Sequence, residues 1–454
     1  MAPMLCCEER TKNIVLASVC MSLCMMAIAP SSSVQNIALA ESTDIDLNVG
    51  YYSEIVKYVA CILSGLIFHP FYKFAGIKIA AGTMVLLVTG AYWPMIWIVN
   101  KYVIYLGYFI SGIGVGSMWI MWPMTVTDNS DRKSAQSNMG YWWIAVALGP
   151  TVGGLSNYFY FQNVSKISPA NRMMINGICA GITILAAIIA VLGISDIKET
   201  SGHVTLKEIE DITYVEIDQE ENGKMHKENH EDEDNQSLSH TEQNSASIME
   251  WFNTMRKLKE FWILFLPLIY WGFIWGFFVK MLPTATASIS DRRDLIPLTT
   301  LASGAAFLIG STSWNAVSRC TNNTFCVILA TLMDFLAITL SILIFPKEAT
   351  SKILEVGTVE TYISPHYVYP VIIATLIGLA DSGISIFYYT VAGRVYQDKA
   401  SLGFSINNAG FCVFYIISLF APSLFDLHSY CYCMFGAVFL MCLSLTVGLR
   451  RFLN

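Results

Sequence analysis

Residues 216–234 read EIDQEENGKMHKENHEDED, and this acidic run lies in the middle of a chain that is otherwise strongly apolar. The surrounding segment, residues 195–250, holds 16 acidic residues and four lysines, whereas the 454-residue chain has a formal net charge of −7. The net negative charge of the chain therefore comes from this one segment. It contains few large apolar residues, so it cannot bury enough surface to offset its chain entropy. We predict a disordered, water-exposed loop that divides the chain into two halves.

The two halves are too apolar for a water-soluble protein. Hydrophobic residues make up 54% of the chain and charged residues 13%, which is too few charges to cover the surface of a soluble protein of this length. A membrane-spanning helix needs about 20 mainly apolar residues. Twelve segments meet this requirement: 13–35, 50–69, 77–98, 102–125, 138–160, 174–194, 260–282, 297–318, 325–345, 369–391, 402–424 and 429–449. We predict an all-α polytopic membrane protein with 12 transmembrane helices.

The predicted helices group into two bundles of six. The expected divisions are an N-terminus at 1–12, a first bundle at 13–194, an acidic loop with an amphipathic helix at 195–259, a second bundle at 260–449 and a C-terminus at 450–454. With both termini in the cytosol, 18 of the 27 lysines and arginines lie on the cytosolic side and seven lie outside. This distribution follows the positive-inside bias. We expect a plasma-membrane protein, with an endomembrane as the alternative; acylation of Cys6 and Cys7 is left open.

The two bundles share a weak internal repeat. The fourth span carries a stripe of small residues before a tryptophan, and the tenth span carries a similar stripe at a constant offset: Gly112, Gly114, Gly116 and Trp119, and Gly378, Ala380 and Ser382. Stripes of this kind let helices pack closely. Two parallel six-helix repeats joined by a long cytosolic loop are the arrangement of the major facilitator superfamily. We predict this pseudo-symmetric fold.

Ionisable residues inside the spans are the candidate functional residues, because each costs about 2.5–3.5 kcal/mol on insertion scales. Asp381, near the middle of the tenth span, is the candidate for coupling transport to protons or sodium. Its alternative is a structural carboxylate that pairs with Lys280 or bonds to neighbouring hydroxyls. Glu54 and Lys57 are three residues apart on one helical face and can neutralise each other. Asp334, in the ninth span, is assigned a structural role.

Other features of the sequence favour a binding protein over an enzyme or a carrier. No nucleophile and base, metal-ligand cluster or phosphate loop stands at useful spacing, so we expect no enzymatic activity, no cofactor, no metal and no nucleic-acid partner. The loop at residues 70–78 has no acid, although typical facilitators hold their cytosolic gate there with an Asp–Arg pair. On the outer side, Asn163 begins a glycosylation sequon.

Five motifs resemble the UNC-93 family of ion channel regulatory proteins, a divergent branch of the major facilitator superfamily. They are Gly112-x-Gly114-x-Gly116-x-x-Trp119 with Thr127, Gly378-Leu-Ala-Asp381 with Tyr389-Thr390, Ser33-Val-Gln35-Asn36, Lys73-x-x-Gly76-x-Lys78, and Trp142–Trp143 to Gly149. The likeness extends over residues 11–161 and 370–424. It implies a regulatory subunit of two-pore-domain potassium channels or a chaperone that escorts Toll-like receptors, rather than a carrier.

The sequence leaves three candidate functions. The leading hypothesis is a non-enzymatic accessory protein in the lipid bilayer that binds and regulates another membrane protein, a potassium channel subunit. The alternatives are a secondary active transporter of a small-molecule substrate and a trafficking chaperone for Toll-like receptors. For the leading hypothesis, lipid-facing aromatic residues such as Trp93, Trp97, Tyr102 and Tyr105 are candidate contacts, and an interfacial aromatic belt is the simpler explanation for them.

Overall fold

The computed structural model describes residues 2–42, 47–130, 134–162, 164, 167–195, 261–289, 294–349, 361–395 and 400–452. Within these ranges all regular secondary structure is helical. The predicted acidic loop and amphipathic helix lie outside the described residues, apart from Ser195, and so does the sequon residue Asn163.

The N-terminal half is built from six long and short helical elements and a 3-10 turn: α1 (Ala2–Ser42), α2 (Leu47–Leu87), η1 (Val88–Ala91), α3 (Trp93–Trp97), α4 (Lys101–Asp128), α5 (Ala135–Phe161) and α6 (Pro169–Gly193). The described C-terminal half comprises α9 (Phe261–Gly276), η2 (Phe277–Met281), α10 (Leu282–Ile289), α11 (Leu295–Cys320), α12 (Asn323–Ile344), α13 (Val368–Val395), α14 (Ala400–Phe420), η3 (Ala421–Ser423) and α15 (Leu427–Phe452). Helix α1 begins at Ala2, well before the predicted span at residue 13, and therefore includes most of the predicted N-terminal tail.

Ten helical segments in the described ranges are long and apolar enough to cross a membrane. One of them, Val49–Trp97, covers two of the predicted spans. The predicted span at 138–160 corresponds to α5, which is long but is not among the ten. Its amides, glycines and aromatic residues with polar atoms make α5 less apolar than its neighbours. The structure thus shows a multi-pass helical protein that fits a lipid bilayer.

The chain reverses direction within Val49–Trp97. Gly76 has a non-helical backbone with φ 75° and ψ 167°, a left-handed conformation that glycine adopts without steric cost. A Cβ built on Gly114 of α4 would lie 2.5 Å from the carbonyl oxygen of Met84, and one on Gly116 would lie 2.7 Å from that of Cys61. A straight helix would separate Met84 from Cys61 by about 35 Å. Because Met84 and Cys61 contact residues of α4 that are only two positions apart, the segment folds back at Gly76.

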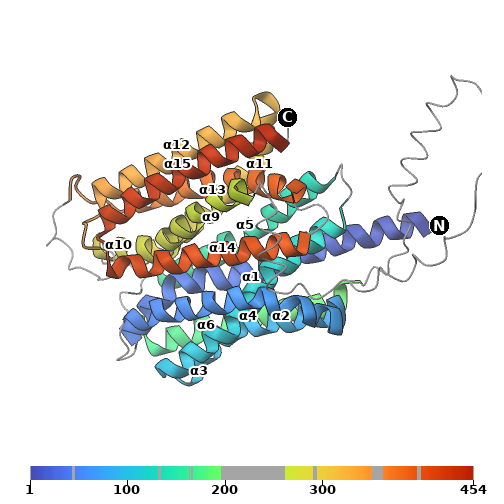
Figure 1. Cartoon of the computed structure of the whole chain (residues 1–454). Helices are drawn as coiled ribbons and strands as arrows, with labels where there is room; N and C mark the ends of the chain where they lie inside the picture. Colours follow the sequence, from blue (N-terminus) through green and yellow to red (C-terminus); the bar gives the residue numbers. More distant parts are fainter. Residues whose placement is uncertain are drawn as a thin grey trace, which may run out of the picture.

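Each half has its own apolar core. The largest cluster of buried apolar residues comes entirely from α9 to α15, and a second comes from α1, α2, α4, α5, α6 and Ile194. The halves meet where α5 packs against α11 and where α14 packs against α2 and α4. The beginning of α1 and the end of α15 lie at the same end of the molecule, as Figure 1 shows.

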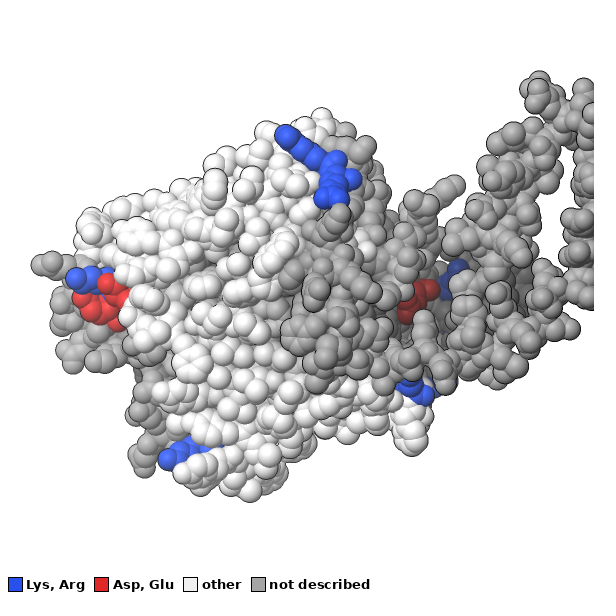
Figure 2. All heavy atoms as spheres, in the orientation of Figure 1, with Lys and Arg blue, Asp and Glu red and all other residues white. Residues whose placement is uncertain are grey.

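Charged side chains avoid the middle of the visible surface. Figure 2 shows Lys, Arg, Asp and Glu near the ends of the helices, with a broad band between them that carries none of these residues. Many large apolar side chains are exposed, including Leu192 at 78% and Ile309 at 61%. In water such a surface would be costly, whereas the hydrocarbon of a bilayer solvates it.

Candidate functional site

A cavity lies between the two halves at the centre of the protein. Its volume is about 150 Å³, and it is lined by residues from α1, α2, α4 and α5 of one half and from α9, η2, α11, α13 and α14 of the other. Of the 32 described residues that line it, 12 are Trp, Tyr or Phe, two are acidic and none is basic. The cavity is therefore an aromatic chamber whose charge comes from Glu54 and Asp381.

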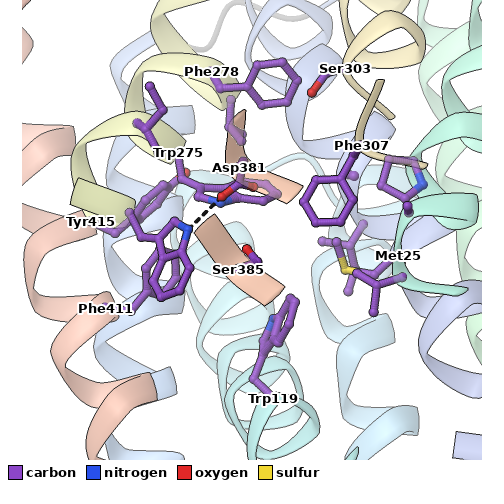
Figure 3. Close-up of a pocket in the computed structure, with 18 of the residues that line it drawn as sticks. Met25, Trp119, Trp275, Phe278, Ser303, Phe307, Asp381, Ser385, Phe411 and Tyr415 are labelled. Carbon is purple, nitrogen blue, oxygen red and sulfur yellow. Dashed lines mark hydrogen bonds between the residues drawn. The ribbon is translucent and has the colours of Figure 1, made fainter. Parts of the chain in front are cut away.

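Asp381 occupies the middle of this chamber. Helix α13 positions it, and Figure 3 shows its carboxylate among Trp275, Phe278 and Phe307, with Ser385 on the same helix. The side chain is only 6% exposed, and its Oδ1 atom accepts a hydrogen bond from the indole N–H of Trp271 at 2.7 Å. Among the described residues, Asp381 forms no ion pair with Lys280, the partner considered from the sequence.

Aromatic rings bridge the two halves on either side of Asp381. The Trp143 ring of α5 lies 5.1 Å from the Tyr389 ring of α13 and 5.7 Å from the Phe307 ring of α11, measured between centroids. On another wall, Tyr58 of α2 lies 4.2 Å from Tyr415 of α14. Contacts of this geometry add about 0.5–1.5 kcal/mol each beyond burial. They hold the halves together while they enclose the cavity.

A buried ion cluster lies beside the cavity, and Glu54 belongs both to this cluster and to the cavity lining. Glu54 forms an ion pair with Lys57, one turn along α2, and its Oε1 atom lies 3.5 Å from Nζ of Lys280 in η2. Lys280 also donates a hydrogen bond to the carbonyl of Ser32 in α1 at 3.1 Å. The structure therefore places Glu54 and Lys57 together, as their spacing predicts, and adds Lys280 from the other half.

Local backbone geometry brings Lys280 into this cluster. It lies in η2, a π-helical stretch that interrupts the span between α9 and α10. π-Helical stretches are rare and are frequent at functional sites. The Lys57 ammonium lies 5.1 Å from the centroid of the Tyr58 ring and 5.7 Å from that of Tyr108. Aromatic faces of this kind stabilise a cation that is removed from water.

The glycines of the predicted stripe lie at close helix contacts. A Cβ on Gly112 would overlap the carbonyl of Lys57, and one on Gly378 of α13 would overlap the backbone of Ser303 in α11. Trp119, at the end of the stripe, lines the cavity, and its ring lies 6.1 Å from that of Trp143. The stripe thus sets the distance between α4 and α2, and Trp119 connects it to the cavity.

Asp334 is buried apart from the cavity. It accepts a hydrogen bond from the Tyr270 hydroxyl at 2.9 Å and is fully buried in α12. Because Tyr270 and Trp271 are consecutive in α9, one helix donates to both Asp334 and Asp381. Asp334 therefore joins α12 to α9, and it does not line the central cavity.

The aromatic lining was not identified from the sequence. Trp143, Trp271 and Tyr389 belong to different helices, and a single sequence does not show which rings face one another. A usable signal was the run YWGFIWGFF at residues 270–278, which places an unusual density of aromatic residues in one span. Three of its aromatic members, Trp271, Trp275 and Phe278, line the cavity.

The comparison with known families gives a match along nearly the whole membrane part of the chain. Residues 41–446 match the family described as ion channel regulatory protein UNC-93. The matched region contains the described ion cluster, Asp381 and the glycine stripe, and it runs through both halves. The chain belongs to the UNC-93 family of ion channel regulatory proteins.

Proposed function

We propose that this protein is a non-enzymatic accessory subunit that binds and regulates a potassium channel in the membrane. The observation that carries this proposal is the match to an ion channel regulatory family over residues 41–446. The apolar helical surface supports it, because a membrane partner can pack against such helices within the bilayer.

We also propose the full 12-helix arrangement of two six-helix bundles, with the major facilitator fold. The reversal at Gly76 supports two spans within Val49–Trp97. Helix α5, at 27 residues, is long enough to supply another. The separate apolar cores of the two halves agree with a pair of bundles.

The proposed topology places both termini in the cytosol and the protein in the plasma membrane. The shared location of the two ends of the chain in Figure 1 supports a common side for them. Residue 163 then lies on the opposite side, between α5 and α6, where its sequon would make the protein a glycoprotein.

Purification of the tagged protein from its own cells in mild detergent tests the regulatory function. We expect a potassium channel subunit to co-purify at near-equal stoichiometry and its currents to change when this chain is removed. A tagged multi-pass protein of another family serves as the control. A chain that purifies alone and leaves potassium currents unchanged would contradict the proposal.

Substitution of exposed aromatic residues tests where the channel contacts this protein. Trp97 is 72% exposed and Tyr102 is 69% exposed. The double variant Trp97→Ala and Tyr102→Ala should lose the channel if this patch is the contact. Trp262→Ala is the matched control, because Trp262 is 65% exposed and lies at the beginning of α9, in the other half of the chain. Equal co-purification of both variants would assign the patch to an interfacial aromatic belt.

The central cavity favours a second candidate function, transport of a small solute. Asp381 lies in a chamber between two halves, the position at which carriers bind substrate. Such a function requires saturable flux that is lost in Asp381→Asn while the protein still reaches the membrane. A regulatory subunit without transport activity shows no such flux.

A further inference from the structure

We propose that the central cavity binds a small organic cation, with its positive group at Asp381 and its apolar part against the surrounding aromatic rings. The proposal goes beyond the regulatory function and does not depend on it, since it concerns a ligand of this chain rather than a protein partner.

The first support is a buried acid without a counter-charge. Asp381 is 6% exposed and faces the cavity. Among the described residues, no lysine, arginine or histidine lies within 4.0 Å of its carboxylate. The hydrogen bond from Trp271 satisfies Oδ1 but brings no charge. A carboxylate removed from water keeps its charge only beside an opposite charge and otherwise takes up a proton. A cationic ligand supplies that opposite charge.

The second support is the contrast with the other acid of the cavity. Glu54 also lines the chamber, but its carboxylate is held by Lys57 and Lys280. Among the described residues that line the cavity, Asp381 is therefore the one acid without an ion-pair partner. This arrangement selects a ligand with one positive charge over a dication, and it disfavours an anion.

The third support is the chemistry of the walls. The face of an aromatic ring is negative and attracts cations, most strongly for tryptophan. Trp271 contacts Asp381 directly, and the Tyr389 ring lies 6.0 Å from the Trp271 ring and 5.1 Å from the Trp143 ring. Aromatic cages of this composition recognise quaternary ammonium groups. A neutral apolar ligand would leave Asp381 unpaired.

The size of the cavity limits the ligand. The cavity volume is about 150 Å³, and an apolar cavity of about this volume holds benzene. We therefore infer a ligand with one aromatic ring or a small alkyl group attached to the ammonium nitrogen. Phenyltrimethylammonium is a suitable probe, and its uncharged isostere tert-butylbenzene differs only in carbon for nitrogen.

Equilibrium binding of radiolabelled phenyltrimethylammonium to the purified full-length chain in lipid nanodiscs tests the proposal. We expect saturable binding that Asp381→Asn weakens by at least about tenfold, which corresponds to about 1.4 kcal/mol. Asparagine keeps an acceptor for the Trp271 indole and removes only the charge. Asp334→Asn is the matched control, because it neutralises a buried acid outside the cavity, and it should bind the probe like the unmodified chain.

Competition experiments keep the test decisive if the Asp381 variant folds poorly. Neither tert-butylbenzene nor benzenesulfonate should displace the labelled probe from the unmodified chain, whereas unlabelled phenyltrimethylammonium should. Displacement by tert-butylbenzene at similar concentrations would overturn the proposal, and so would the absence of saturable binding. Equal affinity in Asp381→Asn would overturn it as well. None of these results depends on whether a channel co-purifies.

Discussion

The variant Glu54→Gln should lose about 3–5 kcal/mol of stability, the cost of breaking a buried ion pair by removing one partner. The side chains of Glu54 and Lys280 are each 1% exposed and that of Lys57 is 5% exposed. The substitution removes the negative charge that lies beside the ammonium groups of both Lys57 and Lys280. We expect a lower apparent melting temperature in detergent and less protein at the membrane.

An exposed ion pair provides the control for this prediction. Lys347 and Glu348 lie 3.9 Å apart, and their side chains are 61% and 55% exposed. Exposed pairs contribute about 0–1 kcal/mol, so Glu348→Gln should melt close to the unmodified chain. If Glu54→Gln also melts close to the temperature of the unmodified chain, the ion cluster does not stabilise the fold.

A second substitution tests whether charge or packing accounts for the stability lost in Glu54→Gln. The double variant Glu54→Gln and Lys280→Met also removes one of the two ammonium groups that faced Glu54, and it keeps most of the lysine stem. We expect part of the lost stability to return, because an apolar residue of similar volume can replace a buried charge at little cost. A double variant less stable than Glu54→Gln would show that Lys280 acts mainly through its bond to Ser32.

Loss of the ion cluster should also affect the connection between the two halves. Glu54 belongs to α2, Lys280 to η2 and Ser32 to α1, so the cluster ties three spans together at one end of the cavity. Its loss should weaken the halves where they meet. This position explains why a membrane protein retains three ionisable side chains in an apolar region despite their cost.

Interactions between residues close in the chain could be predicted from the sequence, whereas contacts between distant helices could not. The pairing of Glu54 with Lys57 follows from helical spacing alone, because residues three apart share a face. The contact of Lys280 with Glu54 and the bond from Trp271 to Asp381 join residues far apart in the chain. They depend on how whole helices pack, which one sequence does not specify. The apolar runs likewise predict the helices but not the rings that face the cavity.

The helix boundaries in the structure also differ from those predicted from the sequence. The sequence separates spans at 50–69 and 77–98 with an irregular loop, whereas the structure continues helical hydrogen bonding to either side of Gly76. Pro70 lies inside this helix although proline lacks the N–H of a regular helical bond. Apolarity locates a span in the bilayer but does not locate the last helical turn, which can extend beyond the hydrocarbon.

The close approach of α4 to α2 should make Gly112→Ala destabilising by about 1–3 kcal/mol, the usual cost of overpacking. The added Cβ would overlap the Lys57 carbonyl and lie 2.7 Å from Cβ of Ala60. Backbone atoms cannot move aside as a flexible side chain can, so α4 must shift away from α2. Because Lys57 is at this contact, the shift also disturbs the ion cluster.

Gly177→Ala is the matched control for Gly112→Ala. Gly177 lies in α6, and a Cβ there meets no atom within 4 Å. Alanine is favoured over glycine in a helix interior by about 0.8–1.0 kcal/mol, so this variant should melt at or above the temperature of the unmodified chain. The same chemical change thus has opposite expected effects at the two positions. Thermal unfolding of both variants measures them, and a Gly112→Ala chain as stable as the Gly177→Ala chain would contradict the close packing of α4 on α2.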